Sequence, residues 1–161
     1  MRDVIVNSTP LIILCNIGQL RILRDIYGEI IIPEAVYREV TEKEDSACIQ
    51  IMSANEWIHV TQIKDSSEKK MYKAKLHDGE VEVMILAQEK GADSLVVIDD
   101  NAAKKTAKYL GLTVTGTMGV LLKAKKLGII EEIKPILQEM KKSGFYVSDS
   151  LIKLVLEQAG E

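Results

Sequence analysis

The stretch Leu95-Val96-Val97-Ile98-Asp99-Asp100-Asn101-Ala102-Ala103-Lys104-Lys105 decides the fold, because it joins an apolar run to two carboxylates and then to a helix. The four apolar residues predict a strand buried on both faces, as in a parallel sheet that helices cover. The helical spacing of the following apolar residues predicts a helix, which Asp100 or Asn101 would cap. The sequence therefore places Asp99 and Asp100 at the carboxyl end of a strand, where open α/β sheets bind ligands.

Strands and helices alternate along the rest of the chain. Apolar, β-branched runs predict strands at residues 3–7, 29–32, 57–60, 95–98 and 112–115. Helical spacing predicts helices at about 8–15, 19–27, 33–40, 42–55, 78–90, 101–110, 120–127, 131–142 and 148–158. This alternation predicts an α/β fold in which helices cover both faces of a central, mostly parallel sheet. We expect one domain over residues 1–161, with the C-terminal helices at about 131–158 packed on it.

Composition narrows the class of protein. The chain has 161 residues, of which 47% are hydrophobic and 28% charged, and it has no apolar segment of membrane-spanning length. It begins on an apolar run without a basic region or cleavage site, so we expect a cytoplasmic protein without membrane contact. Cys15 and Cys48 lie far apart, which favours buried free thiols over a disulfide or zinc site. A net charge of −3 with 4% aromatic residues predicts that any nucleic-acid contact is local.

Polar side chains are predicted to meet at one edge of the sheet. Asn7 ends the first strand, Asp99 and Asp100 end the fourth, and Glu80 lies in the first turn of the helix at 78–90. Glu80 shares its helix face with the apolar residues three, four and seven positions later, so it should point inward. Glu82 falls on another face and should be the nearer of the two to solvent.

Clustered carboxylates favour a bound cation. Glu39 lies beside the buried stripe of the helix at 33–40 and adds a further acid. Neighbouring buried carboxylates repel one another, and a divalent ion such as Mg²⁺ or Mn²⁺ removes that penalty. Each residue also has a purely structural interpretation. Asp99 and Asp100 would cap a helix, Glu80 would lie against a lysine, and Asn7 would bond its own backbone in a turn.

Lysines near these acids have two interpretations. Lys104 and Lys108, one helical turn apart after the acidic pair, would hold substrate phosphates or form a solvated helix face. A second group, in the polar segment 64–75, has the same two interpretations, with the solvated face favoured. It contains Lys69, Lys70, Lys73 and Lys75.

Five stretches carry a family resemblance when they are taken together and in order. They are Val6-Asn7-Ser8-Thr9-Pro10, Pro33-Glu34-Ala35-Val36-Tyr37-Arg38-Glu39-Val40, Asp78-Gly79-Glu80, Val97-Ile98-Asp99-Asp100-Asn101-Ala102-Ala103-Lys104 and Thr115-Gly116-Thr117-Met118-Gly119. Over nearly the whole chain they resemble a PIN-like domain, in particular the small prokaryotic group described as predicted nucleic-acid-binding proteins. The resemblance implies a three-layer α/β/α sandwich. It also implies an endoribonuclease that uses Mg²⁺ or Mn²⁺ on single-stranded RNA.

The resemblance also implies a set of site residues. The metal ligands would be Asn7, Glu39, Glu80, Asp99 and Asp100, and the last four would be catalytic. Thr9 would place a hydroxyl close to Asn7, and would contact substrate together with Lys104 and Lys108. Many members are toxins of toxin–antitoxin pairs, so the resemblance implies an antitoxin partner and a homodimer.

Asn7 departs from the family pattern, since PIN domains usually carry aspartate at the end of the first strand. An amide oxygen can bind a hard cation but adds no charge, so metal affinity should fall and a second metal should be harder to hold. Two functions therefore remain open: a metal-dependent ribonuclease, and a PIN-fold binding module that acts through protein or RNA partners. Leu151, Leu154 and Val155 on the last helix would form the apolar surface of such a module, or ordinary core. A receiver domain or an aspartate phosphatase would need an acid where Asn7 lies.

Overall fold

The computed structural model describes residues 2–70 and 76–161, and its centre is a five-stranded parallel sheet. The strands lie in the order β3-β2-β1-β4-β5, and each neighbouring pair is parallel. Their bounds are β1 (Val4–Val6), β2 (Ile30–Pro33), β3 (Ile58–Thr61), β4 (Leu95–Val97) and β5 (Thr113–Thr115). The predicted α/β class and parallel sheet are confirmed, and β3 and β5 lie at the two edges of the sheet.

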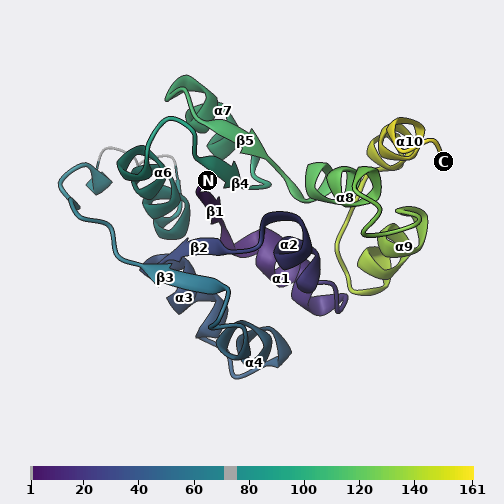
Figure 1. Cartoon of the computed structure of the whole chain (residues 1–161), viewed down its shortest axis with the longest axis horizontal. Helices are drawn as coiled ribbons and strands as arrows, with labels where there is room; N and C mark the ends of the chain where they lie inside the picture. Colours follow the sequence, from purple (N-terminus) through teal and green to yellow (C-terminus); the bar gives the residue numbers. More distant parts are fainter. Residues whose placement is uncertain (1, 71–75) are drawn as a thin grey trace.

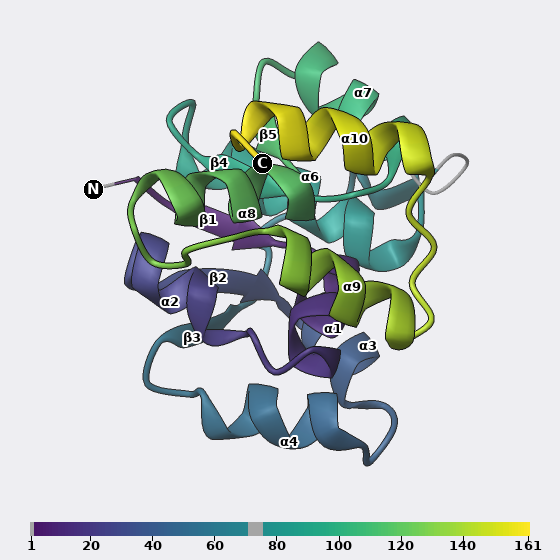
Figure 2. The ribbon, with the colours of Figure 1, turned by 90° about the vertical axis from the view of Figure 1, so that its right-hand side faces the viewer.

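Helices cover both faces of this sheet. The helices are α1 (Ser8–Asn16), α2 (Arg21–Tyr27), α3 (Glu34–Thr41), α4 (Ser46–Ser53), α6 (Asp78–Lys90), α7 (Asn101–Tyr109), α8 (Thr117–Lys126), α9 (Lys134–Lys142) and α10 (Asp149–Gln158). Figure 1 shows α6 on one side of the sheet and α1 and α2 on the other, which gives the predicted α/β/α sandwich. Figure 2 shows the C-terminal helices α8, α9 and α10 gathered in front of the sheet.

The central strands are apolar because both of their faces are covered. All three residues of β1 and all three of β4 are buried, and Ile5 and Val96 are fully enclosed. The two strands pair in register, with Val6 beside Val97. A parallel strand under two helical layers has no solvent face, so its sequence lacks the alternation of a half-exposed strand. This explains why an uninterrupted apolar run was a reliable strand signal.

Helix α6 is enclosed more completely than its sequence suggests. Every residue from Gly79 to Ala87 is buried, so the prediction that Glu82 reaches solvent is wrong. The Glu82 side chain is only 6% exposed. Its Oε1 accepts a hydrogen bond from the Ala35 backbone N–H at 3.1 Å, and its Oε2 accepts one from Lys69 Nζ at 2.7 Å. These two donors compensate the carboxylate for the water it loses, which is what burial of a charge requires.

The sequence favoured a solvated helix face for Lys69, and for this residue that prediction is wrong. Besides Glu82 it contacts the Asp78 carboxylate at 2.9 Å, and only 20% of its side chain is exposed. The hydrogen bond that Lys69 donates to Glu82, and more weakly the one to Asp78, raises the pKa of Lys69 above its ordinary value. Glu82, on α6, also accepts the Ala35 N–H in the first turn of α3. The buried carboxylate that Lys69 neutralises therefore joins α3 to α6. Lys73 and Lys75 lie outside the described residues.

Replacing Lys69 by Met should destabilise the protein. The substitution leaves the buried Glu82 carboxylate without its closest cation, and we expect the free energy of unfolding to fall by about 2 kcal/mol. Urea denaturation followed by circular dichroism measures the change. Lys70→Met, at an exposed neighbouring position, is the matched control and should change stability little. Equal effects of the two substitutions would contradict the ion-pair argument.

The C-terminal helices are held together by the last residue. Glu161 Oε2 accepts the Ile133 N–H at 2.8 Å, and Glu161 Oε1 accepts the Lys134 N–H at 3.1 Å. Lys125 Nζ, on α8, donates to the Ala159 carbonyl and to Glu161. The carboxylate thus satisfies free N–H groups at the start of α9 and links α8 to the end of α10.

The contribution of Glu161 should depend on pH. The Ile133 N–H, with Lys125 and Lys134, holds the pKa of this carboxyl below its ordinary value. A lowered carboxyl pKa gives stabilisation that is complete above the ordinary glutamate pKa and disappears as the pH falls through the lowered one. We therefore expect Glu161→Gln to cost about 1 kcal/mol at pH 7 and almost nothing at strongly acid pH. Thermal unfolding of both proteins across this pH range checks the difference, and a constant difference would refute it.

The cysteines match the prediction of free thiols. Cys15 and Cys48 are both buried and unbonded to each other. Burial, with a smaller contribution from Asp45, raises the pKa of Cys15 to about 12, which disfavours a reactive thiolate. Within residues 2–70 and 76–161, no helix has the length and apolar character needed to cross a membrane.

Candidate metal centre and adjoining groove

The candidate site lies where the strand order of the sheet reverses. From β1, the chain continues to β2 and β3 on one side, whereas β4 and β5 lie on the other. Ligands of open α/β sheets bind at such a switch point, beyond the carboxyl ends of the strands. Asn7 directly follows β1 and donates its N–H to the Val97 carbonyl at 2.9 Å, and Asp99 follows two residues after Val97. The predicted meeting of the ends of β1 and β4 is confirmed by this pairing.

Asn7 carries an unused ligand atom. Its side chain is buried, and its Oδ1 accepts no hydrogen bond from the described residues. Asn7 occupies the cap position of α1, but its side chain does not cap that helix, so the structural interpretation as a self-bonded turn residue is wrong. A buried carbonyl oxygen without a partner costs free energy that a bound cation or water molecule would recover.

Gly79 leaves a gap between this oxygen and Glu39. A Cβ atom at Gly79 would lie 3.0 Å from Glu39 Oε2 and 3.6 Å from Asn7 Oδ1. Glu39 is exposed at its end of α3, yet its Oε2 accepts a 2.8 Å hydrogen bond from Ser8 Oγ, which orients the carboxylate. Asn7 and Glu39 therefore face the same small volume, and that volume is open because position 79 has no side chain.

Glu80 points inward as predicted. It is 7% exposed, and its Oε1 accepts the His77 backbone N–H at 2.9 Å. This bond closes the first turn of α6 and replaces the lysine partner that the structural interpretation had supposed. The bond also orients the Glu80 carboxylate at the start of α6, where Glu80 directly follows Gly79 in the chain.

Asp99 is tied to the start of α8. Its Oδ1 accepts the Thr117 N–H at 2.7 Å, and its Oδ2 accepts the Thr117 hydroxyl at 2.7 Å. This anchor explains why α8 begins at Thr117, three residues before the predicted start. Gly116 gives the carboxylate room, because a Cβ there would lie 2.7 Å from Asp99 Oδ1 and 2.9 Å from Lys104 Nζ.

Asp100 behaves differently from its neighbour. It is exposed, and its Oδ2 accepts the Ala103 N–H at 2.9 Å, so it caps α7. For Asp100 the structural interpretation therefore describes what is observed. The capping bond uses one of its oxygens, and a direct role at the metal would have to use the other.

An open groove continues from Asp99. It has a volume of about 1280 Å³ and brings together Thr9, Asp99, Lys104 and Lys108, so the predicted substrate residues share one surface with one of the predicted acids. Residues 115–119 line one part of it, and the segment between α9 and α10 lines another. Glu39 and Gly79 line a separate, shallower hollow of about 690 Å³ beside α3.

The donor set fits a hard divalent cation by its chemistry. Its atoms are carboxylate and amide oxygens, the unpaired Asn7 Oδ1 is aimed at the Gly79 gap, and Glu39 faces the same gap. In the described parts of the chain, no three His, Cys, Asp or Glu side chains converge on one point. Glu80, Asp99 and Asp100 each accept a hydrogen bond from a backbone N–H. Asn7 Oδ1 is therefore the oxygen of this set that is buried without a donor from the described residues, and Glu39 lies across the Gly79 gap from it.

The sequence analysis assigned no role to several residues that shape this site. Ser8 and Thr117 orient Glu39 and Asp99, and Gly79 and Gly116 leave the space between the polar groups. All four lie within the stretches that carried the family resemblance, and that was the available signal; Ser8 and Gly79 also directly adjoin the predicted ligands Asn7 and Glu80. The contacts of Glu82 with Lys69 and Ala35 had no such signal, because they join distant segments.

A parallel α/β/α sandwich with oxygen ligands at its switch point defines a class of ligand-binding α/β domains. Within that class, a family model described as a PIN domain matches residues 3–161, and the chain therefore belongs to the PIN-domain family. A search among curated proteins finds no match to the chain. Membership indicates a nuclease-like function and nucleic-acid binding in general terms, in a family that generally depends on divalent metals.

Filling the gap at Gly79 should separate metal binding from stability. Gly79→Ala places a methyl group between Glu39 Oε2 and Asn7 Oδ1, and we expect the affinity for Mn²⁺ to fall about tenfold or more. Alanine is the better helix former by up to about 1 kcal/mol, and the Glu39 tip can move aside, so stability should hold or rise. Isothermal titration calorimetry with Mn²⁺ and urea unfolding of the same variant provide the two readouts. Unchanged Mn²⁺ binding would exclude this gap as the metal site.

Proposed function

We propose that the protein is a Mg²⁺- or Mn²⁺-dependent endoribonuclease that hydrolyses phosphodiester bonds of single-stranded RNA. The observation that carries the proposal is the groove in which Asp99 lies with Lys104, Lys108 and Thr9, at the sheet edge where β1 also ends, directly before Asn7. Family membership supplies the general nuclease character. In the groove, Lys104 and Lys108 would bind phosphates of the RNA, and Asp99 would lie near the scissile bond.

Asn7 and Glu39 would hold the metal ion, with Asp99, Glu80 and Asp100 as the remaining predicted ligands. Bound there, the ion would lower the pKa of water and offset charge on the scissile phosphate. Ser8 and Thr117 would keep the Glu39 and Asp99 carboxylates in place through the hydrogen bonds that they already make. Such preorganised groups do not need to be reoriented during the reaction.

The remaining steps belong to side chains of the chain itself. Oε2 of Glu80 accepts no hydrogen bond from a described residue, so it would be free to accept a proton from the attacking water. Lys104 and Lys108 would hold phosphates on either side of the scissile bond. Water would attack phosphorus in line with the leaving 3′ oxygen, and the family resemblance implies products with 5′-phosphate and 3′-hydroxyl ends.

A second function is favoured by the amide at position 7. Without an aspartate there, the open part of the site carries one formal charge, from Glu39, which suits weak metal binding. The protein would then act as a PIN-fold binding module, with RNA or a protein partner in the groove. The exposed Leu151 and Leu154 in the groove wall fit that alternative, whereas Val155 is 2% exposed and belongs to the core.

Substitutions at Glu39 and Asn7 test the proposal in opposite directions. Glu39→Gln removes the carboxylate of the open pair, and should abolish both Mn²⁺ binding and Mn²⁺-dependent cleavage of single-stranded RNA. Asn7→Asp adds a charge at the unpaired oxygen and should strengthen Mn²⁺ binding about tenfold. Calorimetry and gel analysis of a labelled RNA give the two measurements.

Glu34→Gln, at an exposed position of the same helix, is the matched control and should leave both measurements unchanged. Metal-dependent cleavage that survives Glu39→Gln would refute the assignment of the site. RNA binding without cleavage in both the natural protein and Asn7→Asp would refute the ribonuclease and favour the binding module.

A further inference from the structure

The wall of the groove opposite the lysines carries an unusually exposed aromatic ring. Tyr146 lies in the segment that joins α9 to α10, here called the α9–α10 strap (residues 144–148), and it is 92% exposed. It lines the same groove as Asp99 and Lys104. Its neighbours Phe145 and Val147 also line the groove but pack against the core, so Tyr146 is the exposed one of the three consecutive apolar side chains.

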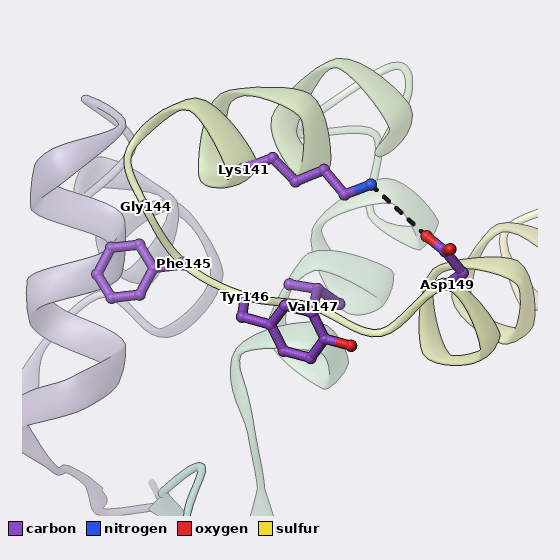
Figure 3. Close-up of a pocket in the computed structure, with 6 residues that line it drawn as sticks. All are labelled: Lys141, Gly144, Phe145, Tyr146, Val147 and Asp149. Carbon is purple, nitrogen blue, oxygen red and sulfur yellow. Dashed lines mark ion pairs between the residues drawn. The ribbon is translucent and has the colours of Figure 1, made fainter.

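The strap fixes the backbone from which this ring projects. Val147 is 7% exposed and anchors the strap on one side of Tyr146, and the partly buried Phe145 anchors it on the other. Figure 3 shows the Phe145 and Tyr146 rings projecting in different directions, with the ion pair between Lys141 and Asp149 spanning the strap. That pair is exposed and contributes little by itself. The backbone at Tyr146 is therefore already ordered, and a contact would have to order only the side chain.

The groove also has cations that lack acidic partners. Lys104 and Lys108 lie one turn apart on α7, and neither forms an ion pair with any residue in the described segments. Asp99, the acid in the same groove, is already satisfied by Thr117. The groups left to bind a ligand are therefore two cations and an aromatic ring, which match the phosphates and the base of a nucleotide chain.

We infer that Tyr146 stacks on an unpaired base of single-stranded RNA whose phosphates contact Lys104 and Lys108 as the strand approaches Asp99. This subsite rests on the proposed function, since it names the path of the substrate. The groove volume of about 1280 Å³ exceeds the roughly 300–1,000 Å³ of a small-molecule pocket, so it suits a segment of polymer. Bases inside a duplex are stacked on one another, so only an unpaired base can reach the ring.

Binding without metal tests the subsite separately from cleavage. Fluorescence anisotropy would measure the affinity of a labelled octauridine in EDTA for the natural protein, Tyr146→Leu and Tyr146→Phe. Loss of one stacked base should weaken binding about fivefold or more in Tyr146→Leu, whereas Tyr146→Phe keeps the ring and the affinity. Tyr109→Leu is the matched control, because Tyr109 is 90% exposed on α7 but does not line the groove.

A ligand without bases isolates the stacking interaction. The natural protein and Tyr146→Leu should bind an abasic oligonucleotide of the same length with equal, weaker affinity. Lys108→Gln should instead weaken both ligands, and should reduce the slope of log K against log salt by about 0.7, as expected for one lost phosphate contact to a single strand.

Three outcomes would overturn the subsite. In the first, Tyr146→Leu binds octauridine as tightly as the natural protein, which refutes the subsite. If the natural protein nevertheless cleaves RNA with Mn²⁺, the proposed ribonuclease function is retained. Tyr146→Leu could change the molar mass measured by light scattering but not RNA affinity, which would make a second copy the occupant of the groove. No RNA binding by the natural protein would overturn subsite and proposed function together. Ring-dependent binding without cleavage would support the subsite and overturn the ribonuclease.

Discussion

The parallel pairing of β1 with β4 is the constraint on which the site depends. Val6 lies beside Val97, and the next backbone bond, from the Asn7 N–H to the Val97 carbonyl, fixes where polar residues can begin. Because both strands are buried, a shift of one residue would place Asn7 or Asp99 within the apolar core. The register of two apolar strands therefore determines which oxygen atoms meet at the edge of the sheet.

Burial of polar groups around this edge follows two different patterns. Glu82 is buried with a backbone N–H and a lysine, so its role is to hold α3 against α6. Asn7 is buried with no described partner for its Oδ1, although Ser8 beside it bonds Glu39. A buried oxygen without a partner, at the sheet edge where parallel α/β proteins bind ligands, is a place where function, rather than folding, accounts for the residue.

The sequence was sufficient for the fold and for part of the site. Apolar runs ending in Asn7 and Asp99 predicted the strands and their common edge, because burial on both faces has an unambiguous sequence pattern. The environment of Glu82 was predicted wrongly, since helical periodicity assumes one solvent face and α6 has none over residues 79–87. The separate role of Asp100 could not be predicted either, because adjacent carboxylates have the same sequence signal and differ only in which N–H group each one meets. The assignment of one domain to residues 1–161 stays a prediction.

The segments that line the groove differ in how clearly the sequence marks them. Lys104 and Lys108 follow the acidic pair on α7, whereas Tyr146 comes from a strap after α9 that no motif marks. Phe145 and Val147 pack against the core and fix the strap on either side of Tyr146, which leaves the ring of Tyr146 exposed between them. Because the sheet edge supplies the acid and the C-terminal helices supply the ring, the C-terminal layer would govern which strands reach the site, and the sheet would govern what happens to them there.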